Sequence, residues 1–206
     1  VSVDLTGAAD QLDATRDALL GNFAVAILLS YLLLVAIFTH WGYPLLILVT
    51  VPTGVAGGIL GLLALNLAGS ASAALGLGGF SQPFDMITML GFLILLGTVV
   101  NNPILVVDRT RANLGRGLAL DEAILDAVRA RLRPILMSTL TTLFGLAPLV
   151  LVPGAGTELY RGVGVVVLAG LLCSTVVTLS FLPSLLRLVL AGKAGLQVQG
   201  ADAGGR

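Results

Sequence analysis

The sequence predicts an all-α membrane protein, a five-helix transmembrane bundle. Hydrophobic residues make up 57% of the 206-residue chain and charged residues only 11%, whereas soluble domains carry roughly 25% charged residues. Five apolar segments reach the length of about 20 helical residues that a bilayer core about 30 Å thick requires. The basic residues between these segments fall mainly on one side of the predicted membrane.

The predicted spans are apolar segments separated by short polar connections, and they cover about residues 20–39, 44–67, 86–108, 134–152 and 162–186. Residues 1–19 are interpreted as the end of a periplasmic region that leads into the first span. Residues 20–190 form the predicted transmembrane domain, and residues 191–206 a disordered cytoplasmic tail. The chain begins without Met or a signal-peptide pattern, so we expect it to be a fragment of a longer protein.

Small residues mark the second span as a packing helix. Gly54 with Gly58, and Gly57 with Gly61, form two GxxxG pairs, which permit close approach of a neighbouring helix. Such pairs are frequent in membrane helices and are therefore a weak functional signal.

The third span carries the most informative polar residues. Asp85 is placed to cap its start. Asn101, Asn102 and Asp108 lie in an otherwise apolar segment, where polar groups are expensive unless they have partners or water. Thr98, Asn101 and Asp108 share one helix face by their spacing. Two interpretations stay open from the residues alone: these side chains bind helices together, or they form a functional site.

The fourth span adds Ser138, and Arg131 lies seven residues earlier on nearly the same face. Before this span, residues 118–130 have apolar positions at near-helical spacing with acidic residues between them. This pattern predicts a cytoplasmic amphipathic helix, for which a simple linker is the plainer interpretation.

Basic residues set the predicted orientation. One side of the membrane would hold nine: Arg109, Arg111, Arg116, Arg129, Arg131, Arg133, Arg187, Lys193 and Arg206. The other side would hold only Arg16 and Arg161. The loop at 109–133 and the C-terminus are therefore expected in the cytoplasm.

Several function classes are excluded. The sequence contains no HExxH, GxSxG or P-loop motif, so no soluble-enzyme site is expected. The formal net charge is zero and no long basic tract exists, which argues against nucleic acid as a partner. The sequence gives no sign of an organic cofactor or a metal site.

Five short motifs in order resemble the resistance-nodulation-division (RND) efflux permeases of the acriflavin-resistance or multidrug type, over essentially residues 1–190. They are FDMITMLG at 84–91, GTVVNNPILVVD at 97–108, RARLRPILMS at 129–138, GLAPL at 145–149 and GAGTEL at 154–159. The resemblance implies a C-terminal transmembrane fragment holding the last five of twelve spans.

The resemblance also implies an activity and partners. The full-length protein would be a secondary active transporter, a proton antiporter and not an enzyme, in the bacterial inner membrane. It would export drugs or other small amphiphiles as a homotrimer in the lipid bilayer, with a periplasmic adaptor and an outer-membrane channel. The proton would be its coupling ion.

By the same resemblance, the proton-binding aspartates lie on a helix of the first half, outside this chain. Many drug-pump members carry Lys where this chain has Asn101, and an amide cannot form the charge pair that Lys makes with carboxylates. Arg131 and Ser138 match family positions linked to the proton relay. The relay candidates are Asn101, Asn102, Thr98, Asp108, Arg131 and Ser138.

Two alternatives remain beside a drug exporter. One is a non-pumping membrane scaffold or degenerate paralogue. The other is a metal or lipid exporter of the same superfamily.

Overall fold

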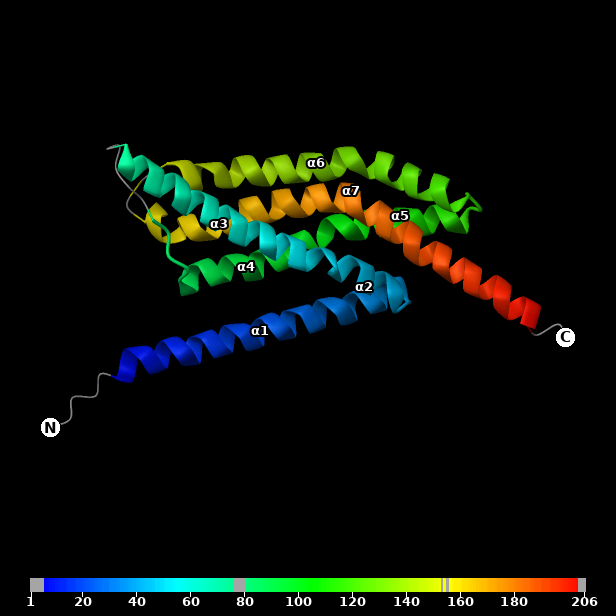
Figure 1. Ribbon diagram of the computed structural model, residues 1–206, viewed down its shortest axis with the longest axis horizontal. Coiled ribbons are helices and arrows are strands. Elements are labelled where there is room, and N and C mark those ends of the chain that lie inside the picture. The colour runs from blue at the N-terminus through cyan, green and yellow to red at the C-terminus, as the bar shows by residue number, and fades with distance from the viewer. Residues whose placement is uncertain (1–5, 76–80, 153, 155, 204–206) are drawn as a thin grey trace.

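The computed structural model describes residues 6–75, 81–152, 154 and 156–203, and all its regular elements are helices (Figure 1). They are α1 (Thr6–Phe38), α2 (Gly42–Leu48), α3 (Thr50–Ala74), α4 (Met86–Val99), α5 (Asn101–Gly115), α6 (Leu120–Leu151) and α7 (Thr157–Ala203). Five stretches are long and apolar enough to cross a membrane, because α2 with α3, and α4 with α5, each form one span. The predicted fold class is confirmed.

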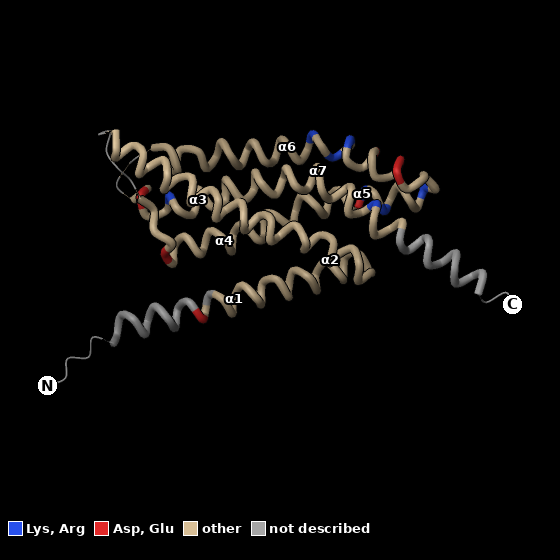
Figure 2. The backbone as a smooth tube through the Cα atoms, viewed as in Figure 1, with Lys and Arg blue, Asp and Glu red and all other residues tan. Residues whose placement is uncertain are grey.

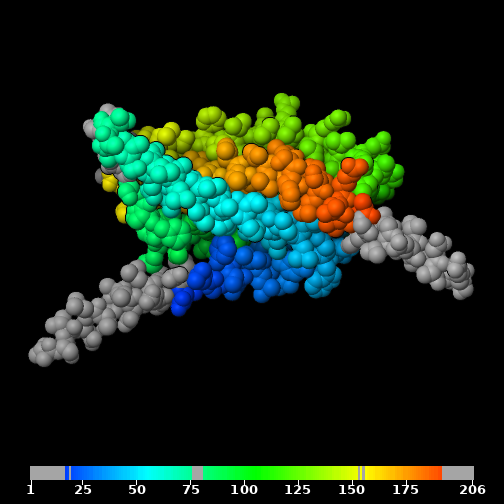
Figure 3. Space-filling model, viewed as in Figure 1, coloured from blue at the N-terminus to red at the C-terminus, as the bar shows by residue number. Residues whose placement is uncertain are grey.

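Helix α7 is the centre of the bundle. It packs against α3, α4 and α6, and the space-filling view shows it between α3 and α6 (Figure 3). Helix α1 lies at the edge, where it contacts α2 and α4. The two ends of the chain lie at opposite ends of the bundle (Figure 1), as an odd number of spans requires.

Proline explains the two interruptions inside spans. Pro103 has no N–H for the carbonyl of Val99, and Pro52 has none for the carbonyl of Leu48. Next to Pro103, the amide of Ile104 reaches the carbonyl of Val100 only at 3.4 Å. One helix therefore ends at Val99 and the next begins at Asn101, which separates Thr98 from Asn101 and Asp108 on the helix face predicted for the three.

The helices of all five spans extend beyond the predicted bounds, and α1 already begins at Thr6 while α3 ends only at Ala74. Helix α5 continues past residue 108 to Gly115, and α7 continues to Ala203 through the region for which the sequence favours a disordered tail. Helix α6 joins the predicted amphipathic helix at 118–130 to the fourth span without a break. Pro134 is tolerated inside it because the carbonyl that loses its donor belongs to Ala130, an exposed residue.

The glycines of α3 lie where other helices come closest. A Cβ added at Gly54 would lie 2.7 Å from Cγ2 of Val99 on α4. Cβ atoms at Gly57 and Gly61 would collide with Cys173 and Ala169 of α7. At Gly58, an added Cβ would lie 3.0 Å from Phe92 and 3.1 Å from Val166. The absence of side chains on α3 therefore lets α7 and α4 pack against its backbone.

The outer helices expose apolar side chains. Only 6% of the most apolar window of α1 and 11% of that of α6 are buried within the bundle. Leu33 on α1 and Phe144 on α6 are 63% and 75% exposed. A continuous apolar surface of this kind is stable against lipid or further protein.

Charged residues separate toward the ends of the bundle (Figure 2). Arginines gather toward the end that holds the α5–α6 turn. The opposite end, where α4 and α7 begin, holds Asp85, Glu158 and Arg161. The predicted cap at Asp85 is confirmed, since its Oδ1 accepts from the amide of Thr88 at 2.8 Å.

Candidate functional site

A polar groove of about 370 Å³ runs between α1, α4, α5 and α6. Seven of its lining residues carry side-chain hydroxyl or amide groups: Ser30, Thr98, Asn101, Asn102, Ser138, Thr139 and Thr142. Apolar residues such as Leu33 of α1 and Leu171 of α7 complete the lining. Because its residues come from the interiors of four spans, this groove places polar groups at membrane depth.

Four of the six candidates from the sequence line this one groove: Thr98, Asn101, Asn102 and Ser138. Asp108 and Arg131 do not. Asp108 is exposed, and it forms no hydrogen bond or ion pair within the described part of the chain. Arg131 is half-buried, and its Nε is buried with no hydrogen-bond partner among the described residues.

The hydroxyl groups of the groove are mostly satisfied by their own helices. Thr98 donates to the carbonyls of Ile94 and Leu95 at 3.2 and 3.0 Å, and Ser138 donates to that of Ile135 at 2.9 Å. Their remaining lone pairs are acceptors. The side chain of Asn101 is different, because it is exposed and makes no hydrogen bond to a described residue.

Asn102 belongs to a buried cluster of three side chains. Its Nδ2 donates to Oγ1 of Thr175 at 3.2 Å, and Oγ1 of Thr139 lies 3.1 Å from the same oxygen. Asn102, Thr139 and Thr175 are 3%, 4% and 4% exposed. We call this set the α5–α6–α7 cluster, since each helix supplies one member.

Thr139 and Thr175 were missed from the sequence. The available signal was a threonine next to the candidate Ser138, and a polar pair at residues 174–175 inside an apolar stretch. A hydroxyl in a membrane helix commonly bonds to its own backbone, so sequence alone does not distinguish a threonine that bridges helices from one that does not.

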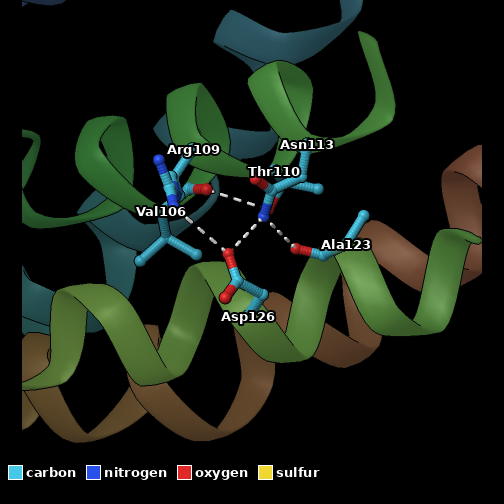
Figure 4. Close-up of polar contacts among 6 residues, drawn as sticks. All are labelled: Val106, Arg109, Thr110, Asn113, Ala123 and Asp126. Carbon is cyan, nitrogen blue, oxygen red and sulfur yellow. Dashed lines mark hydrogen bonds and ion pairs between the residues drawn. The ribbon is translucent and has the colours of Figure 1, made fainter. Parts of the chain in front are cut away.

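A second polar network fixes the turn between α5 and α6 (Figure 4). Nδ2 of Asn113, a residue only 2% exposed, donates to Oδ2 of Asp126 at 2.7 Å and to the carbonyl of Ala123 at 3.1 Å. Arg109 pairs with the same carboxylate at 3.4 Å. This network lies away from the groove and holds two helices together.

Two further arginines tie helices at this end of the bundle. Nη1 of Arg111 donates to the carbonyl of Phe38 at 2.6 Å, at the last residue of α1. A cation there satisfies a free carbonyl and complements the negative end of the helix dipole. Arg187 of α7 pairs with Asp121 in the first turn of α6 at 2.9 Å.

The described residues contain no group of three His, Cys, Asp or Glu side chains placed to hold a metal ion. The hydroxyl and amide groups that line the groove offer hydrogen bonds. The exposed side-chain amide of Asn101 can donate to a carboxylate, accept from an acid, or orient water.

Comparison with known proteins defines the relationship of this chain. The model of the AcrB/AcrD/AcrF family matches residues 1–190. The chain is 35% identical over 179 residues to "Multidrug resistance protein MdtC" of Salmonella paratyphi B, Salmonella heidelberg and Salmonella typhi. The alignment covers 86% of this chain and 16% of each relative.

Five apolar spans with a polar groove between them are the architecture of a polytopic membrane protein. The family match places it in the RND permease class. The chain belongs to the AcrB/AcrD/AcrF family. The family assignment confirms the resemblance drawn from the five motifs.

Proposed function

We propose that this chain is the C-terminal membrane part of a proton-driven RND efflux pump. The pump would export drugs or other small amphiphiles from a Gram-negative-type cell. The observation that carries the proposal is the polar groove. Four relay candidates line it, and the side-chain amide of one of them, Asn101, is exposed. An unsatisfied amide facing lipid is costly, so a further protein segment is expected to cover this face.

The covering segment is proposed to be the carboxylate-bearing helix of the preceding half of the pump. Asn101 would donate to its carboxylate or orient water beside it, while the oxygens of Thr98 and Ser138 accept hydrogen bonds. In this arrangement the five spans are the last five of twelve. The whole pump would work as a homotrimer with a periplasmic adaptor and an outer-membrane channel.

Orientation follows from the charge distribution. The end that carries Arg109, Arg111, Arg116 and Arg187 would lie in the cytoplasm, since basic loops are retained on that side. Helix α7 would then end in the cytoplasm, and the turn before Thr157 would lie in the periplasm.

The first prediction tests Asn101 in the permease that carries this chain. Asn101→Leu should lower proton-coupled efflux about threefold or more, the scale of one lost interhelical hydrogen bond, while trimer yield is kept. Asn101→Asp should be worse, because a second acid beside the carboxylates adds like-charge repulsion. Asn101→Gln keeps the amide and is the control.

Drug efflux from intact cells and the amount of trimer in the membrane are measured for all three variants. Full efflux by Asn101→Leu would mean that Asn101 has no role in transport, and it would remove the groove from the proposed mechanism. Efflux that persists when the proton gradient is collapsed would remove proton coupling.

A further inference from the structure

Thr175 stands directly behind the wall of the polar groove. Asn102 and Thr139 line the groove, and Thr175 does not. Its Oγ1 nevertheless lies 3.2 Å from Nδ2 of Asn102 and 3.1 Å from Oγ1 of Thr139. One hydroxyl on α7 thus contacts a groove residue on α5 and another on α6.

The hydrogen-bond capacity of Thr175 fixes the direction of each bond. A hydroxyl has one proton and two lone pairs. Thr175 gives its proton to the carbonyl of Leu171 at 2.7 Å, so both neighbours must donate to it. Asn102 donates through Nδ2 and Thr139 through its hydroxyl, and the groups left for the groove include acceptor oxygens on both side chains.

We propose that Thr175 is a positioning residue of the polar groove. Its hydroxyl holds Asn102 and Thr139 in register across α5 and α6, and engages one N–H of Asn102 and the hydroxyl proton of Thr139. The inference rests on the proposed function, because this positioning affects transport only if the groove takes part in it.

The neighbouring hydroxyls of α7 supply an internal comparison. Ser174 and Thr178 are both fully buried, and their hydroxyl oxygens have no hydrogen-bond partner within the described residues. Thr178 is on the same helix, is buried as deeply as Thr175, and has the same side chain. Only Thr175 bridges to other helices, so burial and residue type are matched and the bridging bonds differ.

The experiment uses three variants of the permease that carries this chain. Thr175→Val removes the hydroxyl and keeps the shape, and Thr175→Ser keeps the hydroxyl. Thr178→Val makes the same change where no bond is lost. At equal amounts of protein in the membrane, Thr175→Val should lower transport about threefold to tenfold, the range for one or two interhelical hydrogen bonds. Thr175→Ser should recover most of the rate, and Thr178→Val should leave it unchanged.

A spectroscopic readout separates this inference from the proposed function. Asparagine is labelled with ¹⁵N, and the side-chain amide signal of Asn102 is assigned by its loss in Asn102→Ala. Thr175→Val should shift this signal, because the amide loses its acceptor, while Thr178→Val should not.

An unshifted Asn102 signal in Thr175→Val would mean that the bond is absent and would overturn the inference, while the Asn101 variants still test the proposed function. A shifted signal with full transport would reduce Thr175 to helix packing and also overturn it. Equal losses in Thr175→Val and Thr178→Val, or no recovery in Thr175→Ser, would do the same.

Discussion

At the residue scale, this protein depends on amides that satisfy groups from other helices. Asn113 gives both protons of its Nδ2 to α6, one to a backbone carbonyl and one to the carboxylate of Asp126. Asn66 ties down the loop before α4 in another way, since its Oδ1 accepts from the amide of Gln82 at 2.8 Å and its Nδ2 donates to the carbonyl of Gln82 at 3.0 Å. A side-chain amide can imitate a backbone partner, which explains why Asn occurs at these junctions.

The prediction at this scale concerns Asn113. Asn113→Ala should destabilise the protein by about 1–3 kcal/mol, because it removes two hydrogen bonds from a buried amide to α6, one of them to a carboxylate. Arg109→Ala removes a longer ion pair between partly exposed side chains and should cost about 1 kcal/mol or less. Thermal unfolding of the purified protein in detergent compares the two, and a larger loss for Arg109→Ala would contradict this ranking.

At the element scale, the bundle is organised by the contact of α3 with α7. Four glycines on α3 face Val99, Phe92 and the small or branched residues of α7. Helix α7 can therefore lie close to α3 and still contact α4 and α6 on its other sides. The central place of α7 follows from having a neighbour without side chains along one face.

This contact gives a prediction for Gly57. Gly57→Ala should destabilise the protein by about 1–3 kcal/mol, since the added Cβ would collide with Cys173 and lie 3.1 Å from the backbone carbonyl of Ala169. Gly145→Ala is the control, because nothing lies within 4 Å of a Cβ there. It should be neutral or stabilise α6 by up to about 1 kcal/mol.

Both changes are followed by the melting temperature of the purified protein. If Gly57→Ala were as stable as Gly145→Ala, close packing at the α3–α7 contact would not limit the bundle.

At the scale of the whole molecule, the charged ends and the apolar middle predict a topology. Arg116 is exposed in the turn between α5 and α6, and Tyr160 is exposed near the start of α7, at the other end. In a protein made free of other cysteines, Arg116→Cys should react with a thiol reagent only from the cytoplasm. Tyr160→Cys should react from the periplasm. If an impermeant reagent labelled position 116 in intact cells, the proposed orientation would be wrong.

The sequence predicted much of the architecture at this scale, because a bilayer imposes a simple rule. Each span needs a continuous apolar stretch, so the five spans and their order could be read directly from composition. The joining of residues 118–130 to the fourth span was not predicted. Pro134 was interpreted as the start of a new span, whereas in the structure α6 carries this proline in its interior, with the freed carbonyl belonging to exposed Ala130.

The candidate site was predictable in part for a related reason. Polar residues such as Asn101, Asn102 and Ser138 stand out against an apolar background, and they meet in one groove. Helical spacing put Asp108 on the same face as Asn101, and both residues lie on α5. Asp108 is about two turns further along this helix, beyond the residues that line the groove.

By itself, the sequence determined the class of this protein: an all-helical, five-span membrane bundle with basic residues concentrated toward one end and polar residues in its third span. Only the tertiary structure decided which of those residues meet. Asn102 and Thr175 are far apart in the chain and are joined by a hydrogen bond, whereas Thr178, with the same side chain and burial, has no partner within the described residues. The reason is physical: hydrophobicity is a property of each residue, but a hydrogen bond depends on where another helix places its partner.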